Sequence, residues 1–238
     1  MSRDRRLDWD GCNNVRDLGG LRTTDGRVTR LGALVRSDHP GRLTPHGWSA
    51  LYEYGIRTII TLATDGLPDD VPADTMPRPA DIVTLRCAIE DYADTDFVQQ
   101  WVMTDLWATP LYFYDAMKRW PERYAAVVTA VARAQPGGVL FHCVRGNDRT
   151  GIVALLLLAL VGVVPEEIIA DYELSPDPER DILLARHNTT TRETILATLA
   201  QLDFAQHLQD GGLSQADLTA VRTRLLEPTD TEVNERDK

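Results

Sequence analysis

Short apolar runs alternate with amphipathic segments along most of the chain. The runs that read as strands are residues 57–62, 82–85 and 139–141, with shorter candidates at 27–29 and 34–36. Segments with the 3.6-residue period of a helix are 44–54, 165–172, 191–202 and 214–226. Because strands alternate with helices, the pattern predicts an α/β domain with a mostly parallel central sheet flanked by helices.

The longest apolar stretch, residues 151–160, is predicted to be a buried helix. It is shorter than the roughly 20 residues needed to cross a bilayer, and Arg149 and the pair Glu166-Glu167 flank it. We therefore expect it to be the central helix of the core. Thr44 and Ser214 precede two of the other predicted helices and are expected to cap them.

Two stretches carry the signals of irregular structure. Residues 65–79 contain four prolines and are expected to form a loop. The polar residues 228–238 are expected to form a disordered tail. No linker divides the rest, so 238 residues with 43% hydrophobic content predict one domain with a sizeable core.

The charge and the cysteines narrow the possible partners. A net charge of −11 argues against nucleic acid and against a polybasic membrane patch, and no apolar leader follows the first residues. The three cysteines have no paired spacing, which favours a reducing cytoplasm. We therefore expect a cytoplasmic protein without a stable membrane anchor, and the oligomeric state stays open.

The most informative segment is residues 142–151, which places a cysteine and an arginine at a predicted junction between a strand and a helix. Backbone N–H groups at such a helix start point at a common centre, and the helix dipole adds partial positive charge there. They would stabilise a thiolate at Cys143 and bind an anion. Arg149 offers a planar fork that pairs with two phosphoryl oxygens, and Gly146 permits a tight turn. The segment predicts a phosphate-binding loop with its own nucleophile.

These residues resemble the bacterial tyrosine-protein phosphatase family, whose members share an "NxRDxGG" start and an "HCxxGKDRTG" loop. The similarity extends over residues 14–20, 34–38 and 166–172, and in all from about residue 7 to 227. The resemblance implies a single cysteine-phosphatase-like domain over 7–227. The family includes tyrosine phosphatases with additional lipid-phosphatase activity.

The resemblance also implies roles for individual residues. Cys143 attacks phosphorus and forms a phosphocysteine, Asp148 gives a proton to the leaving alcohol, and Thr150 hydrogen-bonds the thiolate. The phosphate is held by the loop, Val144, Arg145, Gly146, Asn147, Asp148 and Arg149. Support is expected from His142, Thr150, Arg16 and Asp17. No metal and no cofactor is needed.

Two departures from the family pattern bear on the substrate. Asn147 stands where relatives usually have lysine, so one cation is missing unless Arg145 replaces it. Residues 59–63 differ from the "DLR" of many relatives, so a buried contact between an aspartate and an arginine is absent or relocated. Both weaken the inference of substrate class more than that of reaction type.

Several residues have two interpretations. Trp120-Pro121-Glu122 resembles a mobile acid loop, but a proline and a glutamate there fit a helix start better. Asp105 and Asp115 are weaker candidate acids than Asp148. The aromatic residues between 97 and 120 are expected to be core rather than site. Arg16 and Asp17 are read as an ion pair that braces the loop or as substrate contacts.

The remaining cysteines and three competing functions complete the expectations. Cys12 and Cys87 are expected to be inert, with a Cys12–Cys143 disulfide as a weaker alternative. The leading function is hydrolysis of phosphoprotein, most simply at phosphotyrosine. The alternatives are a phosphatase for a phosphorylated metabolite or phosphoinositide, and a phosphate-binding pseudophosphatase. An intact Cys143, Asp148 and Arg149 count against the last.

Overall fold

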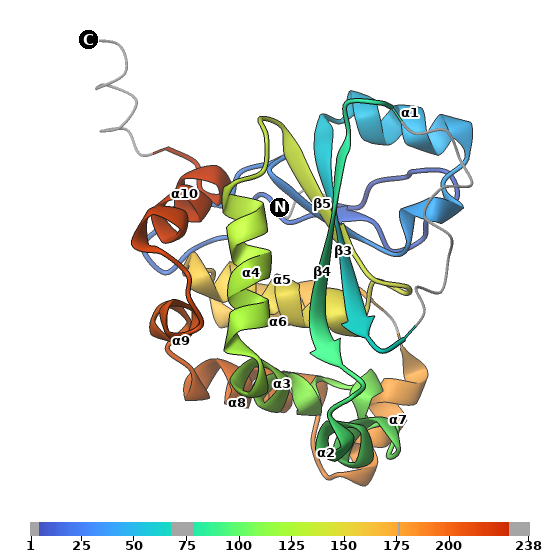
Figure 1. Ribbon diagram of the computed structural model, residues 1–238, viewed down its shortest axis with the longest axis vertical. Coiled ribbons are helices and arrows are strands. Elements are labelled where there is room, and N and C mark those ends of the chain that lie inside the picture. Colours follow the sequence, from blue (N-terminus) through green and yellow to red (C-terminus); the bar gives the residue numbers. More distant parts are fainter. Residues whose placement is uncertain (1–4, 68–78, 176, 229–238) are drawn as a thin grey trace.

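The computed structural model describes residues 5–67, 79–175 and 177–228. Most of the expected proline-rich loop, residues 68–78, and most of the expected tail, residues 229–238, lie outside the described residues. Within the described ranges strands and helices are interspersed up to residue 142, and only helices follow it (Figure 1).

The centre of the molecule is a five-stranded sheet in the order β1-β2-β5-β3-β4. Its strands are β1 (Arg16–Asp17), β2 (Leu34–Ser37), β3 (Ile56–Asp65), β4 (Val83–Asp91) and β5 (Gly138–His142). The pairs β2·β5, β3·β5 and β3·β4 are parallel, and only the short edge strand β1 runs antiparallel to its neighbour. The predicted mostly parallel sheet is therefore confirmed.

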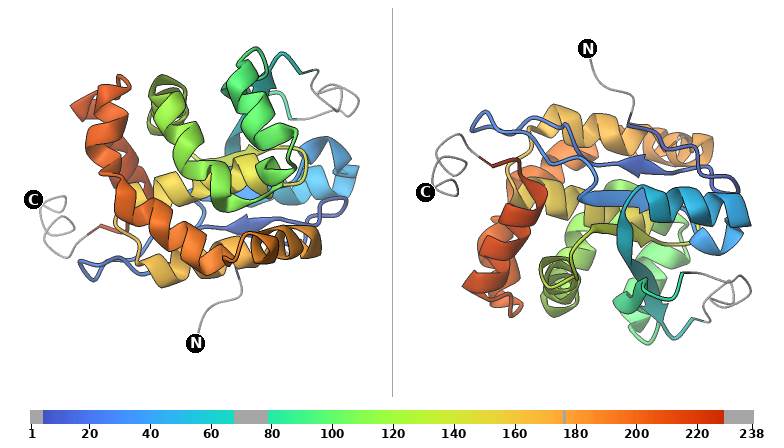
Figure 2. Two further views of the ribbon diagram at one scale, coloured as in Figure 1. Left: turned by 90° about the horizontal axis from the view of Figure 1, so that it is seen from below. Right: turned by 90° about the horizontal axis from the view of Figure 1, so that it is seen from above.

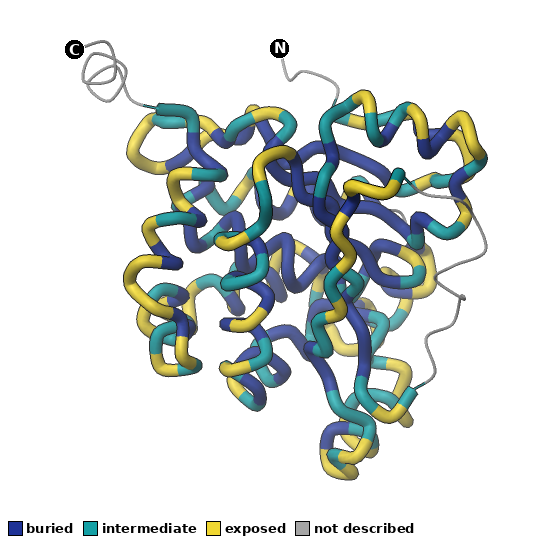
Figure 3. The backbone as a smooth tube through the Cα atoms, turned by 45° about the horizontal axis from the view of Figure 1, so that its top comes forward, coloured by how far each residue is buried: buried dark blue, intermediate teal, exposed yellow. Residues whose placement is uncertain are grey.

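Alternate residues of the central strands enter two hydrophobic cores. On β5, Val139 and Phe141 join the larger core, whereas Leu140 joins the smaller one. Successive side chains of a strand point to opposite faces, so a short fully apolar strand implies that both faces are covered. Figure 3 shows this buried centre surrounded by helices whose outer surfaces are exposed.

Helices cover both faces of the sheet unequally (Figures 1 and 2). Helix α1 (Pro45–Glu53) contributes Trp48 and Leu51 to the smaller core. The larger core is built mainly by α3 (Phe113–Arg119), α4 (Pro121–Ala132), α5 (Asp148–Leu160), α6 (Pro165–Glu173), α8 (Thr191–Gln201), α9 (Phe204–Asp210) and α10 (Gln215–Leu225). The remaining short elements are α2 (Thr95–Phe97), α7 (Pro178–Arg186), a π-helical turn η2 (Val98–Val102) and the 3₁₀ turns η1 (Pro40–Arg42), η3 (Leu106–Ala108) and η4 (Pro110–Tyr112).

The predicted caps and the central helix are confirmed. Thr44 accepts a hydrogen bond from the backbone of Gly47 at 3.2 Å, and Ser214 accepts one from Asp217 at 3.0 Å. Helix α5 is apolar on all sides and lies inside the larger core, because helices and the sheet surround it. No helix in the described ranges is long and apolar enough to cross a membrane.

Three expectations about local structure need correction. Residues 27–29 form only isolated bridges, Arg22 with Val28 and Thr29 with Leu226, rather than a strand. β4 extends to Asp91 because it pairs along the length of β3. Helices α7 and α9 were not predicted from the sequence, and α9 has only seven residues.

Candidate active site

The phosphate-binding loop lies between the C-terminal end of β5 and the start of α5. His142 is the last residue of the strand, Asp148 is the first of the helix, and Cys143 is buried between them. Gly146 has φ +74°, and a Cβ there would lie 2.6 Å from the backbone oxygen of Ser37. Only glycine fits this turn, because the loop lies directly against the end of β2.

His142 holds the strand end in place as a neutral imidazole. Its Nδ1 lies 3.1 Å from the carbonyl oxygen of Cys143 and must donate, so its Nε2 accepts from the Thr61 hydroxyl at 3.0 Å. Burial lowers the pKa of His142 to about 3, which keeps the ring uncharged at neutral pH. Thr61 belongs to the segment where relatives carry the "DLR" aspartate, and here a neutral hydroxyl suits a neutral histidine.

Arg149 is fixed at the loop by one hydrogen bond and one ring contact. Its Nη1 donates to the carbonyl oxygen of Leu62 at 3.1 Å, and its guanidinium carbon lies 5.6 Å from the centre of the Trp107 ring. Burial alone would lower the pKa of Arg149, but the charges of Cys143 and Glu90 outweigh it and raise the pKa. The guanidinium therefore remains a cation, as phosphate binding requires.

Glu90 is a buried acid that sequence reasoning missed. It lies near the C-terminal end of β4, where its Oε2 accepts from the Thr64 hydroxyl at 2.9 Å. Its Oε1 is buried with no hydrogen-bond partner among the described residues. Burial raises the pKa of Glu90, and the charge of Arg149 opposes that rise. An acid whose charge acts on the loop arginine is thus carried by β4 rather than by the "DLR" segment of β3.

Asp148 is held by one of its two carboxylate oxygens. Its Oδ2 accepts from Arg145 Nη2 at 2.9 Å, whereas its Oδ1 is buried with no hydrogen-bond partner in the described part of the chain. Burial raises the pKa of Asp148, although Arg145 and its hydrogen bond lower it in part. A carboxyl group with a raised pKa and an oxygen without a hydrogen-bond partner is suited to give and take a proton.

Arg145 lies at the rim of the site and pairs with acids instead of standing free for the substrate. Its side chain is 50% exposed, and besides Asp148 it contacts Asp177 Oδ2 at 3.3 Å. Asn147, which stands where relatives have lysine, accepts from Asn14 Nδ2 at 2.8 Å and donates to the same Asp177 oxygen at 3.4 Å. Asn147 is therefore a link between the loop and its supports.

A buried cluster of charged side chains supports the phosphate-binding loop. Arg36 donates to the carbonyl oxygen of Gly146 at 2.7 Å and to Asp171 at 2.8 Å. Arg16 and Arg5 also contact Asp171, at 3.0 and 2.9 Å. Burial would raise the pKa of Asp171, but the three arginines overcome this and hold its pKa far below the usual range. Neither the role of Asp171 nor that of Arg5 was foreseen from the sequence.

Of the two interpretations of Arg16 and Asp17, the ion pair between them is wrong. Arg16 turns to Asp171, while the Asp17 carboxylate accepts from the backbone N–H groups of Gly19 and Gly32, each at 2.6 Å. Adjacent residues of a strand point to opposite faces, so the two side chains cannot meet. Arg16 supports the loop side of β1, and Asp17 fixes the turns on the other side.

Two further loop residues show unforeseen geometry. The Thr150 hydroxyl is buried without a hydrogen-bond partner among the described residues, so the expected bond to the Cys143 sulfur is not formed. The carbonyl oxygen of Val144 accepts from the backbone N–H of His39 at 3.2 Å. The Val144 contact joins the loop to the segment that follows β2, and the Thr150 oxygen is left without a partner in the described part of the chain.

The other thiols differ in their surroundings from Cys143. Cys12 donates to the carbonyl oxygen of His39 at 3.6 Å, and burial together with the nearby charge of Asp38 raises its pKa to about 12. Burial also raises the pKa of Cys87. Both thiols therefore remain protonated at neutral pH, which makes them poor nucleophiles.

Two of the alternative acids have other tasks, and the third lies at a cavity. Pro121 is the first residue of α4 and Glu122 lies in its first turn, so the interpretation of this segment as a helix start is confirmed. Asp115 accepts from Trp101 Nε1 at 2.8 Å and lies in α3. Asp105 lines a cavity next to the loop.

That cavity, about 630 Å³ in volume, opens between the segment 102–108 and α7. Its walls include the apolar side chains of Trp107, Ile182 and Leu183, and two arginines, Arg145 and Arg186. Trp107 contacts both this cavity and Arg149, which contradicts the expectation that the aromatic residues of 97–120 are core only. Helical spacing cannot distinguish a core tryptophan from one at a site.

Comparisons with known proteins agree with one another. Residues 7–227 match the profile of the "Tyrosine phosphatase family". The chain is 30% identical to the "Putative tyrosine-protein phosphatase" of Cupriavidus necator, over 84% of this chain and 70% of that protein. It is 34% identical to the tyrosine-protein phosphatase of Nostoc commune (60% and 48% covered) and 29% identical to the triple specificity protein phosphatase PtpB of Mycobacterium tuberculosis (70% and 68%).

Proposed function

The chain belongs to the tyrosine phosphatase family, and from this premise we propose that it hydrolyses phosphomonoesters, most simply phosphotyrosine in proteins, through a phosphocysteine. One observation carries the proposal. The buried Cys143 begins the loop after β5, and the loop leads directly to Asp148, which has an oxygen without a partner among the described residues, and to Arg149. Nucleophile, phosphate clamp and proton donor thus come from seven consecutive residues, 143–149.

In the first step the Cys143 thiolate attacks phosphorus. The S–P bond forms while the P–O bond to the leaving group breaks, and the proton of Asp148 passes to the leaving oxygen. Arg149 and the backbone N–H groups of the loop hold the three equatorial oxygens, where the transition state spreads its charge. The raised pKa of Asp148 favours the protonated form that this step needs.

In the second step water attacks the phosphocysteine. The Asp148 carboxylate takes a proton from the water, the new P–O bond forms, and the S–P bond breaks to return the thiolate and release phosphate. Splitting one displacement into two is nucleophilic catalysis, and neither step uses a metal or a cofactor. The remaining phosphate contacts are assigned to the backbone of Val144, Arg145, Gly146 and Asn147, because the side chains of Arg145 and Asn147 are paired with other residues. His142, Thr150 and Arg16 support the loop, and Asp17 supports β1.

The cavity beside the loop is proposed to hold the organic part of the substrate. Trp107, Ile182 and Leu183 offer an apolar wall that suits an aromatic ring such as that of phosphotyrosine. Arg186 on the same cavity favours a second candidate, a phosphoinositide or metabolite with an additional anionic group, whereas Arg145 is paired with acids and Asp105 and Glu179 also line the cavity. Turnover of phosphotyrosine peptide, phosphoinositide and singly charged aryl phosphate would separate these substrates.

The test compares the wild-type protein with Cys143→Ser on p-nitrophenyl phosphate, in reducing buffer with EDTA. We expect metal-independent turnover that falls by at least about 10⁴-fold in Cys143→Ser, because the nucleophile is lost. Vanadate binding should persist in the variant. Cys87→Ser, which changes a half-buried thiol on β4, is the matched control and should retain activity.

Two results would contradict the proposal. Substantial turnover in Cys143→Ser would exclude the phosphocysteine. Vanadate binding without turnover by the wild-type protein on the whole substrate panel would favour the pseudophosphatase alternative. The cytoplasmic location expected from the cysteines remains a prediction that fractionation of cells would test.

A further inference from the structure

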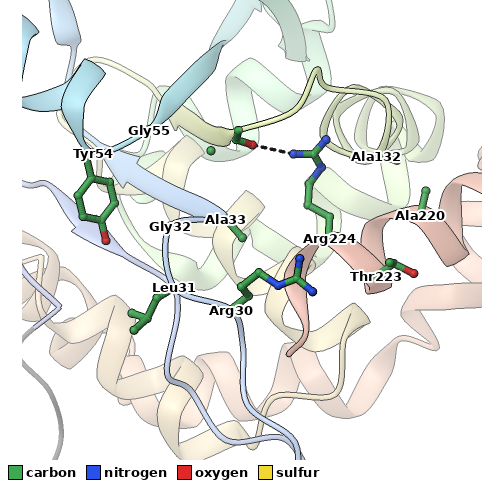
Figure 4. A pocket seen from close by; sticks show the side chains of 12 residues that line it. Arg30, Leu31, Gly32, Ala33, Tyr54, Gly55, Ala132, Ala220, Thr223 and Arg224 are labelled. Carbon is green, nitrogen blue, oxygen red and sulfur yellow. Dashed lines mark hydrogen bonds between the residues drawn. The ribbon is translucent and has the colours of Figure 1, made fainter. Parts of the chain in front are cut away.

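A second cavity lies at the opposite end of the sheet from the phosphate-binding loop. Its volume is about 670 Å³, and it is bordered by the residues that lead into β2 and β5, including Gly32, Ala33 and Gly138 (Figure 4). The catalytic loop, in contrast, follows the C-terminal end of β5. The two sites are therefore separated by the length of that strand, and the mechanism makes no use of this cavity.

Two arginines line this cavity, and no carboxylate does within the described ranges. Arg30 donates one hydrogen bond, to the carbonyl oxygen of Leu226 at 2.9 Å. Arg224 donates to the carbonyl oxygen of Gly137 at 2.9 Å and to that of Ala134. Neither Arg30 nor Arg224 forms an ion pair with a described residue. This is unusual in a chain with 36 acidic and 25 basic residues.

The two like charges affect each other. Burial lowers the pKa of Arg224, and the positive charge of Arg30 lowers it further. Figure 4 shows both guanidinium groups on the α10 side of the cavity. Because a guanidinium has five N–H donors and Arg30 uses one, most of its fork is available to an anion.

The other end of the cavity is formed by an aromatic and an aliphatic side chain, and the Tyr54 hydroxyl there donates to the Asp17 carboxylate behind the wall. Tyr54 lies there with its ring along the cavity, and Leu31 is 41% exposed (Figure 4). Gly32 and Gly55 have positive φ angles, and a Cβ on either would meet no atom within 4 Å. These glycines keep the wall between the cationic end and the aromatic end free of side chains.

We propose that this cavity is a binding site for a small organic phosphate, distinct from the catalytic site. Its phosphate group pairs with the fork of Arg30 beside Arg224, and its apolar part lies against Tyr54 and Leu31. A planar guanidinium pairs bidentately with phosphate oxygens, and a volume of this size holds a small organic molecule.

A purely structural role is the competing explanation for the two arginines. Arg224 binds carbonyl groups beyond the C-terminal end of α4, and Arg30 binds the carbonyl group that follows α10. Cations are favourable at helix C-termini without any ligand. Such a role predicts no response of this cavity to an added phosphate, so ligand binding separates the two explanations.

The experiment is an NMR titration of the ¹⁵N-labelled full chain with phenylphosphonate, which is not hydrolysed by a phosphatase. Amide signals of Ala33, Gly138 and Thr223 report on the cavity, and that of Gly146 reports on the catalytic loop. We expect both groups to shift. In Arg30→Gln the affinity from the cavity signals should fall at least about tenfold, while that from Gly146 stays unchanged.

Two controls make the result specific. Arg27→Gln removes one positive charge from the same connection, outside the cavity, and should leave the cavity affinity within about twofold. Thr223→Glu places a carboxylate at the exposed edge of the cavity, where it should pair with the arginines and displace the ligand. It serves as the second variant if Arg30→Gln does not fold.

The proposal fails if the cavity signals do not shift while that of Gly146 does. It also fails if Arg30→Gln and Thr223→Glu each retain the wild-type affinity at the cavity. Inorganic phosphate provides a further arm and should bind more weakly than phenylphosphonate. Equal affinities for inorganic phosphate and phenylphosphonate would contradict the proposal that the apolar part of the ligand lies against Tyr54 and Leu31. None of these readouts depends on turnover, so they stand apart from the test of the catalytic site.

Discussion

Two buried aspartates beside the phosphate-binding loop have opposite surroundings. Asp171 on α6 has arginine contacts on both oxygens, from Arg5, Arg16 and Arg36. Asp148 on α5 has one oxygen on Arg145 and the other without a hydrogen-bond partner among the described residues. The pKa of Asp171 is lowered and that of Asp148 is raised.

The difference shows how one fold separates support from chemistry. A carboxylate whose oxygens are both occupied stays ionised and holds its neighbours, as Asp171 holds Arg36, which in turn binds the Gly146 carbonyl. A carboxyl group with an open oxygen can exchange a proton with a substrate. The Thr150 hydroxyl, like Asp148 Oδ1, has no hydrogen-bond partner among the described residues.

The largest effect that separates the two aspartates should come from Asp148→Asn. We expect kcat on phenyl phosphate to fall about 10²–10⁴-fold, because the poor leaving group no longer receives a proton. The loss on p-nitrophenyl phosphate should be much smaller, since its leaving group needs little protonation. Steady-state kinetics on the two esters measures the difference, and an equal loss on both would show that Asp148 acts in another way.

The pH dependence gives the sign of the same effect. The first step needs protonated Asp148, so wild-type kcat on phenyl phosphate should decline as pH rises through the raised pKa of this group. Asp148→Asn cannot lose that proton. Its profile should lack this decline, and a decline that persisted would belong to another residue.

Asp171→Asn should chiefly reduce stability. Removing this charge leaves Arg16 and Arg36 buried without compensation, which costs about 3–5 kcal/mol of unfolding free energy. The folded-state pKa of Asp171 is lowered, so its contribution is present above the unfolded pKa and lost as pH falls towards the folded value. Urea denaturation at several pH values measures both the loss and its disappearance in acid.

Asp148→Asn is the matched control for this measurement. It also replaces a buried carboxylate with an amide, but its folded-state pKa is raised, so ionisation of Asp148 stabilises nothing that the variant would lose. We expect a change within about 1 kcal/mol. Equal destabilisation by the two variants would remove the distinction drawn here.

The smallest expected effect is a shift of the pH profile in Arg145→Gln. The Arg145 cation lowers the pKa of Asp148 against the effect of burial, so its removal should raise that pKa. The decline in kcat then moves to higher pH with little change in the plateau. Arg186→Gln, which removes a charge from the same cavity, should leave the midpoint in place.

The central sheet, the buried α5 and the loop itself could be predicted from the sequence. Strand β5 and helix α5 are almost entirely apolar, and that pattern with Cys143 between them is local in the chain. Caps such as Thr44 are local too, since the side chain reaches only three residues on. Signals of this kind depend on residues close together in the sequence, so they can be recognised without the tertiary structure.

The supports of the loop could not be predicted because they come from distant segments. Asp171 meets Arg16 across 155 residues, and Glu90 lies near Arg149 only because β4 joins the sheet beside β3. The error over Arg16 and Asp17 also came from the missing tertiary structure. Adjacent residues of one strand point to opposite faces of the sheet, so the two side chains have different partners. Trp107 was missed because a tryptophan in the core and a tryptophan at a site show the same helical spacing in the sequence.

The most direct test is a carboxyl ¹³C NMR titration of the folded protein that follows Asp148 and Asp171 together. We predict that Asp148 titrates above the ordinary aspartate pKa of about 3.9, and that Asp171 stays ionised to the lowest pH at which the protein is folded. If Asp148 titrated at or below Asp171, the division between a proton-carrying and a supporting aspartate would be wrong.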